Sequence, residues 1–273
     1  MHIGCHVSIA GGVQNAPQRA ADLGAEAMQI FTRSPQGGKA PILKNEICQE
    51  FKISNLKFKI KATVVHTPYY INFASANNRI RYGSVSVVRD ELERASLLGA
   101  EYVMTHLGSA GELSEKQASE KTIEMLKKCL DGYDGSTELL IENSAGAGKI
   151  IGATFSQIAE IIQGVNHPKL TGICLDTQHS FASGYDWRDF ENTLKKIDTE
   201  IGLEKIKLMH ANDSQTEFAS HKDRHEHIGK GQIGETAFKN IVKFANERGI
   251  DMILETEHDF VKEDIELLKN LRN

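Results

Sequence analysis

The chain has few cysteines, and none of them are paired at close spacing. Its 273 residues include four cysteines, Cys5, Cys48, Cys129 and Cys174, and no CxxC pair. Two of the four lie within apolar runs of the kind that form strands. This pattern indicates reduced thiols with mostly structural roles, as in a cytoplasmic protein.

The chain also lacks a long apolar run. No stretch approaches the roughly 20 residues that a membrane-spanning helix requires, so we expect no membrane segment. The first residues, MHIGCHVSIAGGV, contain no basic leader, no long apolar region and no cleavage site. We therefore expect no signal peptide and a cytoplasmic location, beside the nucleoid if the source is prokaryotic.

An excess of positive charge is absent as well. Lys and Arg number 32 against 37 Asp and Glu, which gives a formal net charge of −5. Taken alone, this balance argues weakly against a polyanionic partner such as DNA. The proportions of hydrophobic (40%) and charged (25%) residues are those of an ordinary soluble globular protein.

What the chain does have is a regular series of short apolar runs. There are eight, at residues 2–8, 27–32, 62–68, 102–108, 138–144, 171–177, 206–213 and 252–258. Most are nearly continuous rather than alternating, as expected for parallel strands that are covered on both faces.

Helical stretches separate these runs. Ser114 with Gln117 and Thr154 with Gln157 have the spacing of capping boxes, and Gly249 suits a left-handed helix end. Eight strand–helix repeats without a linker predict one α/β domain over residues 1–273, a (β/α)₈ TIM barrel, which typically takes about 250 residues. A doubly wound open sheet is the alternative, and the number of strands favours the barrel.

Six of the eight runs end in a side chain that can bind a metal. These residues are His66, His106, Glu142, Asp176, His210 and Glu255. The carboxyl ends of all barrel strands meet at one mouth, where barrel active sites are built. Buried carboxylates need a counter-charge, and no Lys or Arg occupies an equivalent strand end. The pattern therefore predicts divalent cations at this mouth.

Two loops offer further candidates. His179 follows Asp176 by three residues, and the stretch HKDRHEHIG at 221–229 contains Asp223, His225 and His227. Each feature also has a simpler interpretation. A single His at a strand end is more often a hydrogen-bonded structural residue, and the 221–229 stretch alone would be a solvated charged loop.

Together these residues resemble the endonuclease IV family of abasic-site DNA endonucleases over almost the full length of the chain. The matching segments are HVSIAGG, VHTPYYIN, THLGS, IENSAGAG, CLDTQHSFASGYD, HANDS, DRHEHIGKGQIG and LET, in the order and at closely the spacing of the family.

The resemblance implies three Zn²⁺ ions per chain, with Mn²⁺ an alternative at oxygen-rich positions. One zinc would take His66, His106 and Glu142, and Glu142 would bridge to a second. The second would be completed by Asp176, His210 and Glu255, and the third would take His179, Asp223 and His225.

The activity that follows from the resemblance is hydrolysis of the phosphodiester bond 5′ to an abasic site in damaged double-stranded DNA. Glu142, as the bridging ligand, would position the attacking hydroxide, and the products would be a 3′-hydroxyl and a 5′ deoxyribose phosphate. Such a deoxyribonuclease IV belongs to base excision repair. It needs no covalent intermediate, and no GxSxG nucleophile motif is present. We expect a monomer without an obligate protein partner.

Several residues are candidates for DNA contact. Tyr69 matches a family position that inserts at the lesion, and Tyr70 could wedge beside it. Arg33, Arg224 and Lys230 are candidates for phosphate contacts. The loop after the second strand departs from the family, because Gln36 and a glycine, Gly37 or Gly38, stand where an arginine and a bulky aromatic are usual. Leu107, Gln178 and Glu257 are further departures, none at a ligand position.

Two other functions compete. A xylose-isomerase-like sugar isomerase or epimerase would use one or two metals and would leave Asp223 and His225 unexplained, whereas a non-catalytic lesion-binding protein would not need every ligand position filled.

The stretch GKGQIG at 229–234 fits a dinucleotide motif but lacks the preceding strand. We expect supporting roles for His6 and His227 and none for His258.

Overall fold

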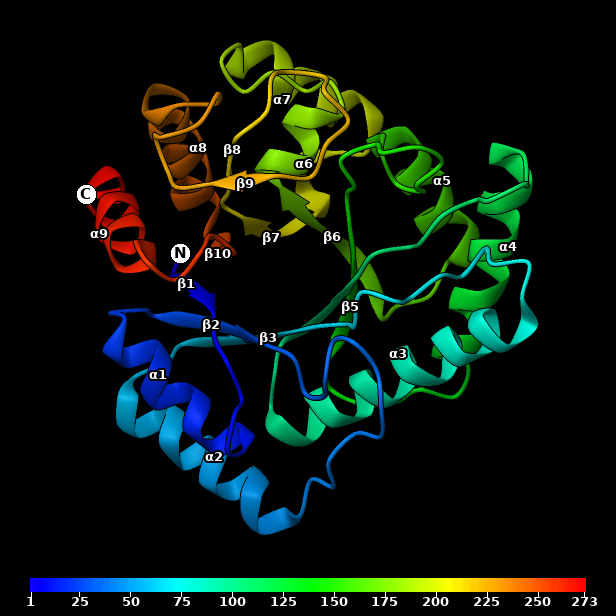
Figure 1. Ribbon diagram of the computed structural model, residues 1–273, viewed down its shortest axis with the longest axis horizontal. Coiled ribbons are helices and arrows are strands. Elements are labelled where there is room, and N and C mark those ends of the chain that lie inside the picture. The colour runs from blue at the N-terminus through cyan, green and yellow to red at the C-terminus, as the bar shows by residue number, and fades with distance from the viewer.

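The computed structural model describes residues 1–273, and its centre is a closed barrel of eight parallel strands (Figure 1). Neighbours around the barrel follow the order β1-β10-β7-β6-β5-β4-β3-β2. The strands are β1 (Ile3–His6), β2 (Ala27–Ile30), β3 (Ala62–His66), β4 (Tyr102–Thr105), β5 (Glu138–Glu142), β6 (Leu170–Asp176), β7 (Ile206–His210) and β10 (Asp251–Leu254). Each lies within or overlaps one of the eight predicted runs. The predicted barrel is therefore confirmed, and the open sheet is excluded.

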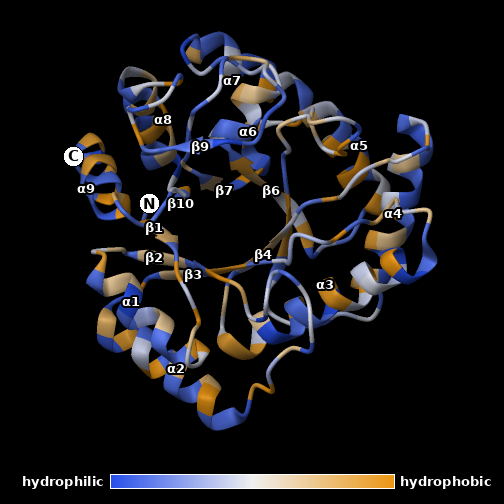
Figure 2. Cartoon of the chain, in the orientation of Figure 1, coloured by the Kyte–Doolittle hydropathy of each residue, from blue (hydrophilic) through white to orange (hydrophobic).

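Helices surround the barrel and cover the outer faces of its strands (Figure 1). They are α1 (Ala16–Asp22), α2 (Asn45–Phe58), α3 (Asn78–Leu98), α4 (Glu115–Leu130), α5 (Phe155–Val165), α6 (Thr177–Ala182), α7 (Phe190–Glu200), α8 (Glu235–Arg248) and α9 (Val261–Arg272), with short 3₁₀ turns at Val13–Asn15 and Leu203–Lys205. In Figure 2 the helices alternate apolar and polar residues along the chain, as amphipathic helices do. None of these helices combines the length and the apolar character that spanning a membrane requires.

The helix ends follow the local sequence signals closely. At the start of α4, Ser114 and Gln117 form the predicted capping box, in which the Ser114 amide donates to Gln117 Oε1 at 3.0 Å. At the start of α5, Thr154 accepts from the Gln157 amide, but the Gln157 side chain accepts from the Gly152 amide instead. Gly249 ends α8 with a φ of 69°, as predicted.

Inside the barrel, one apolar layer fills the centre. Its members are Ala27, Ala62, Val64, Met104, Leu140, Cys174, Leu208 and Ile253. Gly4 completes this layer on β1, where a Cβ atom would lie only 1.8 Å from the Ala27 carbonyl oxygen. The opposite strand faces pack against the helices in a larger core.

Two residues farther along each strand, the same face of the barrel becomes polar, because side chains alternate between faces. We call these residues the mouth ring: His6, Gln29, His66, His106, Glu142, Asp176, His210 and Glu255. The register of the strands thus brings one side chain from each strand, or from the residue just after it, to the same end of the barrel.

The chain between β7 and α8 forms a small sheet beside this mouth. Strands β8 (Asp213–Ser214) and β9 (His225–Glu226) pair antiparallel. The Asp213 carboxylate accepts hydrogen bonds from the backbone amides of Gly229, Gly231, Ile233 and Gly234 at 2.9–3.4 Å. The GKGQIG stretch therefore encloses a carboxylate of its own chain, which accounts for its glycines without a dinucleotide.

Candidate metal centre

The metal-capable side chains of the mouth ring and its loops fall into three groups. These are His66 with His106 and Glu142; Glu142 with Asp176, His210 and Glu255; and Asp176 with His179 and His225. Within each group, one potential ligand atom of every residue lies within 4.8 Å of the others. Glu142 belongs to two groups and so does Asp176.

Glu142 lies at the centre and is fully buried. Its Oε2 is 3.4 Å from His66 Nε2 and 3.2 Å from His106 Nε2. Its Oε1 is 2.9 Å from His210 Nδ1. The two oxygens of one carboxylate thus face two different groups, which is the arrangement of a bridging ligand.

The second group surrounds His210 Nδ1. Besides Glu142, this nitrogen faces Glu255 Oε2 at 3.1 Å and Asp176 Oδ2 at 3.8 Å. Asp176 ends β6 and also caps α6, where its Oδ1 accepts from the His179 amide at 2.6 Å. The segment between Asp176 and His179 is therefore the first turn of a short helix.

The third group lies nearest the solvent. Asp223 Oδ2 is 3.3 Å from His179 Nε2, and Asp223 Oδ1 is 3.4 Å from His225 Nε2. Asp176 Oδ2 also lies 3.8 Å from His225 Nε2. Asp176 therefore stands between the second and third groups, whereas the sequence had suggested a place in the second group alone.

Unpartnered buried atoms show that this mouth fits metal ions. Glu142 Oε2, His179 Nε2 and His225 Nε2 are buried and have no hydrogen-bond partner. Two ligands that bind one zinc tetrahedrally at about 2.0–2.1 Å lie about 3.3–3.4 Å apart. The separations of 3.2–3.4 Å around Glu142 Oε2 and Asp223 match that value.

The charges of the mouth attract cations. No Lys or Arg lies within 4 Å of the carboxylates of Glu142, Asp176, Asp223 or Glu255, whose ion-pair partners are all imidazoles. Burial alone would raise the pKa of Glu142, but the imidazoles of His106 and His210 hold it well below its usual value. Burial would likewise raise the pKa of Asp223, but the His179 imidazole outweighs it and the pKa falls to about 2. Glu142 and Asp223 are therefore ionised at neutral pH.

Buried amides hold the carboxylates in place. Asn143 brackets Asp176, because its Oδ1 accepts from the Asp176 amide at 2.7 Å and its Nδ2 donates to the Asp176 carbonyl at 3.1 Å. Asn212 donates to Asp176 Oδ2 at 2.7 Å and accepts from the Glu255 amide at 2.9 Å. Sequence reasoning missed these residues and Gln29 as parts of the site. Their strand-end positions were the available signal.

The three other histidines near the mouth contact different partners. His6 Nδ1 lies 3.1 Å from the Gln29 amide nitrogen, and burial lowers the pKa of His6 to about 4. His227 Nδ1 lies 2.7 Å from Asp264 Oδ2, at the start of α9, and faces none of the three groups. His258 Nε2 lies 3.0 Å from the His6 carbonyl.

Exposed aromatic side chains lie at the rim. The Tyr69 side chain is 68% exposed and its ring packs edge-on against Phe31 at 5.3 Å and His66 at 5.7 Å. Tyr70 is 39% exposed, and its ring faces Gly37 of the loop after β2. Phe31 is a further rim residue that sequence reasoning missed. Arg224 and Lys230 are exposed, as a contact with DNA requires.

Arg33 lies against α3. Its guanidinium is 7% exposed and pairs with Asp90 and Glu91 of α3. Arg94 completes this cluster by donating to the Thr32 and Pro41 carbonyls at 2.8 Å. Nε and Nη2 of Arg33 therefore tie the loop after β2 to α3, a structural role that the sequence did not suggest, and the phosphate contact stays a prediction.

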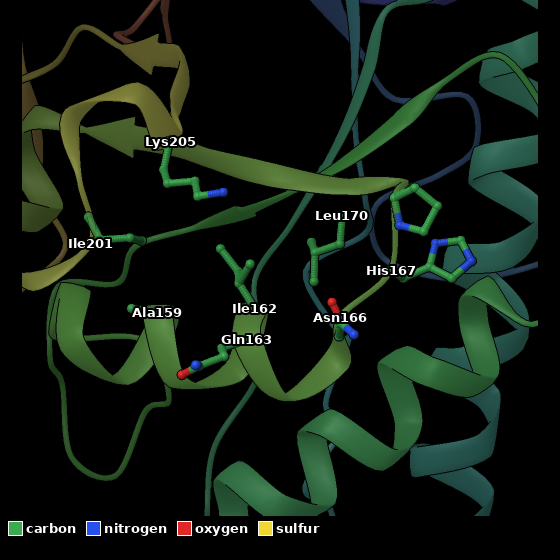
Figure 3. A pocket seen from close by; sticks show the side chains of 9 residues that line it. Ala159, Ile162, Gln163, Asn166, His167, Leu170, Ile201 and Lys205 are labelled. Carbon is green, nitrogen blue, oxygen red and sulfur yellow. The ribbon is translucent and has the colours of Figure 1, made fainter.

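A separate cavity of about 630 Å³ lies at the amino ends of β6 and β7, the end of the barrel away from the mouth ring. Figure 3 shows Ile162, His167, Leu170 and Lys205 around it. None of its lining residues belongs to the three metal-capable groups. Active sites of these barrels lie at the carboxyl ends of the strands, so we place the site at the mouth ring.

Comparison with known proteins identifies the family. A family model described as a xylose isomerase-like TIM barrel matches residues 17–271. A probable endonuclease 4 of Campylobacter hominis is 39% identical over 277 residues, with 98% of each chain covered. A probable endonuclease 4 of Cenarchaeum symbiosum is 35% identical over 277 residues, and the alignment covers 100% of this chain and 99% of the relative.

Solved structures agree. The crystal structure of endonuclease IV from Thermus thermophilus has a TM-score of 0.88 at 33% identity and covers 100% of this chain and 98% of that one. A D-tagatose 3-epimerase-like protein has a TM-score of 0.76 at 22% identity, which shows a common barrel alone. With full-length similarity to these relatives and a metal-capable barrel mouth, the chain belongs to the endonuclease IV family.

Proposed function

We propose that this protein is a metal-dependent hydrolase that cuts duplex DNA on the 5′ side of abasic sites. The observation that carries the proposal is the third group, Asp176 with His179 and His225, which lies against the other two at one mouth and has the Asp223 carboxylate beside both imidazoles. A sugar isomerase with one or two metals would leave this group without a role. A place in base excision repair follows from the reaction, since abasic sites are its intermediates.

Three divalent ions, most simply zinc, fit the donor set. His66, His106 and Glu142 would hold the first, and Glu142, Asp176, His210 and Glu255 the second. His179, Asp223 and His225 would hold the third, with Asp176 close by. Mixed imidazole and carboxylate ligands suit zinc, and manganese is the alternative where oxygen ligands dominate. One chain supplies every proposed ligand, so we propose a monomer. Because its substrate would be damaged DNA, we propose that it acts in the cytoplasm.

Bound metals would supply a water of lowered pKa and positive charge for the phosphate oxygens. Glu142 would be shared by the first two ions, because its two oxygens face two groups at 2.9–3.4 Å. His225 and Asp223, on the solvent side, would hold an ion whose positive charge would stabilise the departing 3′ oxygen as it becomes negative. Asn143 and Asn212 keep Asp176 oriented between these groups.

DNA would reach the mouth along its exposed rim. Arg224 and Lys230 lie on the segment that carries β9 and can contact phosphates, which position a protein on a duplex without reading its sequence. Tyr69 and Tyr70 stand at the edge of the ring and can fill the gap left by a missing base. The loop after β2, with Gln36 and Gly37, offers no aromatic of its own.

Replacing Tyr69 by Ala should therefore weaken binding of lesion-containing DNA. The loss of one stacked aromatic corresponds to about 1–3 kcal/mol. The measurement is the Kd for a duplex with one stable abasic analogue, with the intact duplex as control. An equal loss of affinity for both duplexes would contradict a role at the lesion.

The proposed function is tested by nicking of a labelled duplex that contains one stable abasic analogue. We expect a single cut immediately 5′ of the lesion, no cut after chelator treatment, and recovery of cutting when Zn²⁺ is restored. Metal analysis should give about three ions per chain by the family's ligand pattern. One or two ions, no nicking and turnover of a keto-sugar would establish the isomerase instead. Tight lesion binding without a cut would establish the non-catalytic alternative.

A further inference from the structure

Gln29 is the one member of the mouth ring that offers an amide. It lies on β2, two residues beyond Ala27 of the inner apolar layer, and is fully buried. None of the three metal-capable groups includes it, and β2 provides no ligand to any of them. A fully buried amide beside this many charges needs an explanation, since burying polar groups costs free energy unless they are hydrogen-bonded.

Every polar atom of the Gln29 side chain has a partner in the mouth ring. Its Nε2 lies 2.6 Å from Glu255 Oε1, to which it donates, and 3.1 Å from His6 Nδ1. Its Oε1 lies 2.8 Å from His210 Nε2. An amide has two N–H donors and one oxygen, so these three contacts use both hydrogens and the acceptor.

These contacts also determine which way the amide points. In the reversed orientation its oxygen would face the Glu255 carboxylate at 2.6 Å, where two acceptors repel each other. With the amide nitrogen toward Glu255, the oxygen must face His210 Nε2. His210 then carries its proton on Nε2 and donates it to Gln29.

When His210 is neutral, as a metal ligand must be, a proton on Nε2 places the lone pair on Nδ1. Nδ1 is the nitrogen that faces Glu142, Glu255 and Asp176 at 2.9, 3.1 and 3.8 Å. Gln29 also orients the Glu255 carboxylate. Its amide donates to Oε1, and Oε2 then faces His210 Nδ1. Both atoms that would bind a metal in the second group are therefore the ones that Gln29 leaves free.

We infer that Gln29 is a positioning residue that sets the imidazole tautomer of His210 and the carboxylate orientation of Glu255 for the second metal. The inference rests on the proposed metal centre and extends it to a strand without a ligand. Partners that orient metal ligands in this way typically change metal affinity by about 10–100-fold when they are removed.

The variant Gln29→Met tests it, because methionine has a similar length but no hydrogen-bonding group. We expect a chelator to remove the zinc ion of the second group at a concentration about 10–100-fold lower than in the unchanged protein. The remaining zinc should be retained as in the unchanged protein. Gln157→Met is the matched control, since it removes an amide of α5 that bonds to Gly152 in the preceding loop and to Ser119 on α4, and this amide faces none of the groups. Thermal unfolding of the metal-free proteins shows whether each variant folds.

A second measurement compares the unchanged protein with Gln29→Met. In ¹⁵N-labelled, zinc-loaded protein, the His210 ring should show a protonated Nε2 and a metal-bound Nδ1, and in Gln29→Met the Nε2 proton should exchange faster with water. A metal-bound Nε2 in the unchanged protein would overturn the inference, as would zinc retention in Gln29→Met equal to that of the control. If the unchanged protein bound no zinc at all, the proposed metal centre would be the part that fails.

Discussion

Glu142→Gln is expected to abolish turnover of abasic-site DNA. The substitution preserves the shape of the side chain but replaces one carboxylate oxygen by an amide nitrogen, which cannot bind a metal. Both groups that share Glu142 lose a charged ligand, at separations of 2.9–3.4 Å from three imidazoles. A loss of about 4 kcal/mol of transition-state stabilisation corresponds to a rate about 10³-fold lower.

The measurement is single-turnover nicking of the lesion duplex, with metal content determined on the same sample. Glu138→Gln is the matched control, because Glu138 begins the same strand, β5, at the opposite end of the barrel. We expect the control to cut at the normal rate. Near-normal cutting by Glu142→Gln would contradict its assignment as the bridging ligand, and loss of cutting in both variants would indicate damage to the barrel rather than to the centre.

His225→Ala should lower the rate of cutting much more than it weakens DNA binding. His225 lies on β9 and its side chain is 19% exposed, at the solvent side of the mouth. Its Nε2 lies 3.4 Å from Asp223 and 3.8 Å from Asp176, so its loss would remove a ligand of the third ion, whose positive charge would stabilise the departing oxygen. Removing a group that stabilises charge developing in the transition state typically costs about 10²–10³-fold in rate.

Separate measurement of the single-turnover rate and of the Kd for lesion DNA tests this prediction. His167→Ala serves as the control, since His167 lines the cavity at the other end of the barrel (Figure 3). An intact rate with lost affinity in His225→Ala would show instead that the segment around β9 serves DNA contact alone.

Much of the site could be predicted because it repeats along the chain. His66, Glu142, Asp176 and His210 each end a barrel strand, and the eight apolar runs were visible as strands from their composition alone. Parallel strands in a closed barrel must end at the same mouth. The sequence therefore predicted that residues 34 or more positions apart lie close together.

The residues that escaped prediction are those whose role depends on a partner. Gln29 and Asn212 carry neutral amides, which are common in proteins and have no spacing rule of their own. They become informative only when their donors are seen on Glu255 and Asp176. Phe31 is similar, because its importance lies in the ring of Tyr69 beside it.

Arg33 shows a role that the sequence did not suggest. An arginine in a loop at the barrel mouth is a reasonable phosphate contact, but the sequence does not show that Asp90 and Glu91 on α3 lie directly beneath that loop. The buried Glu91 and the half-exposed Asp90 both pair with this guanidinium, and the low dielectric around Glu91 strengthens that pairing.

The sequence by itself determined the barrel, the end of it that holds the site and the identity of the metal-capable side chains. Those features depend on local composition and on strand periodicity, which are properties of neighbouring residues. Only the tertiary structure decided that Glu142 faces two groups, that Asp176 stands between two others, that Gln29 selects a nitrogen of His210 and that Arg33 turns inward. Each of these depends on the direction of a side chain toward an atom far away in the chain, and packing of the whole barrel sets that direction.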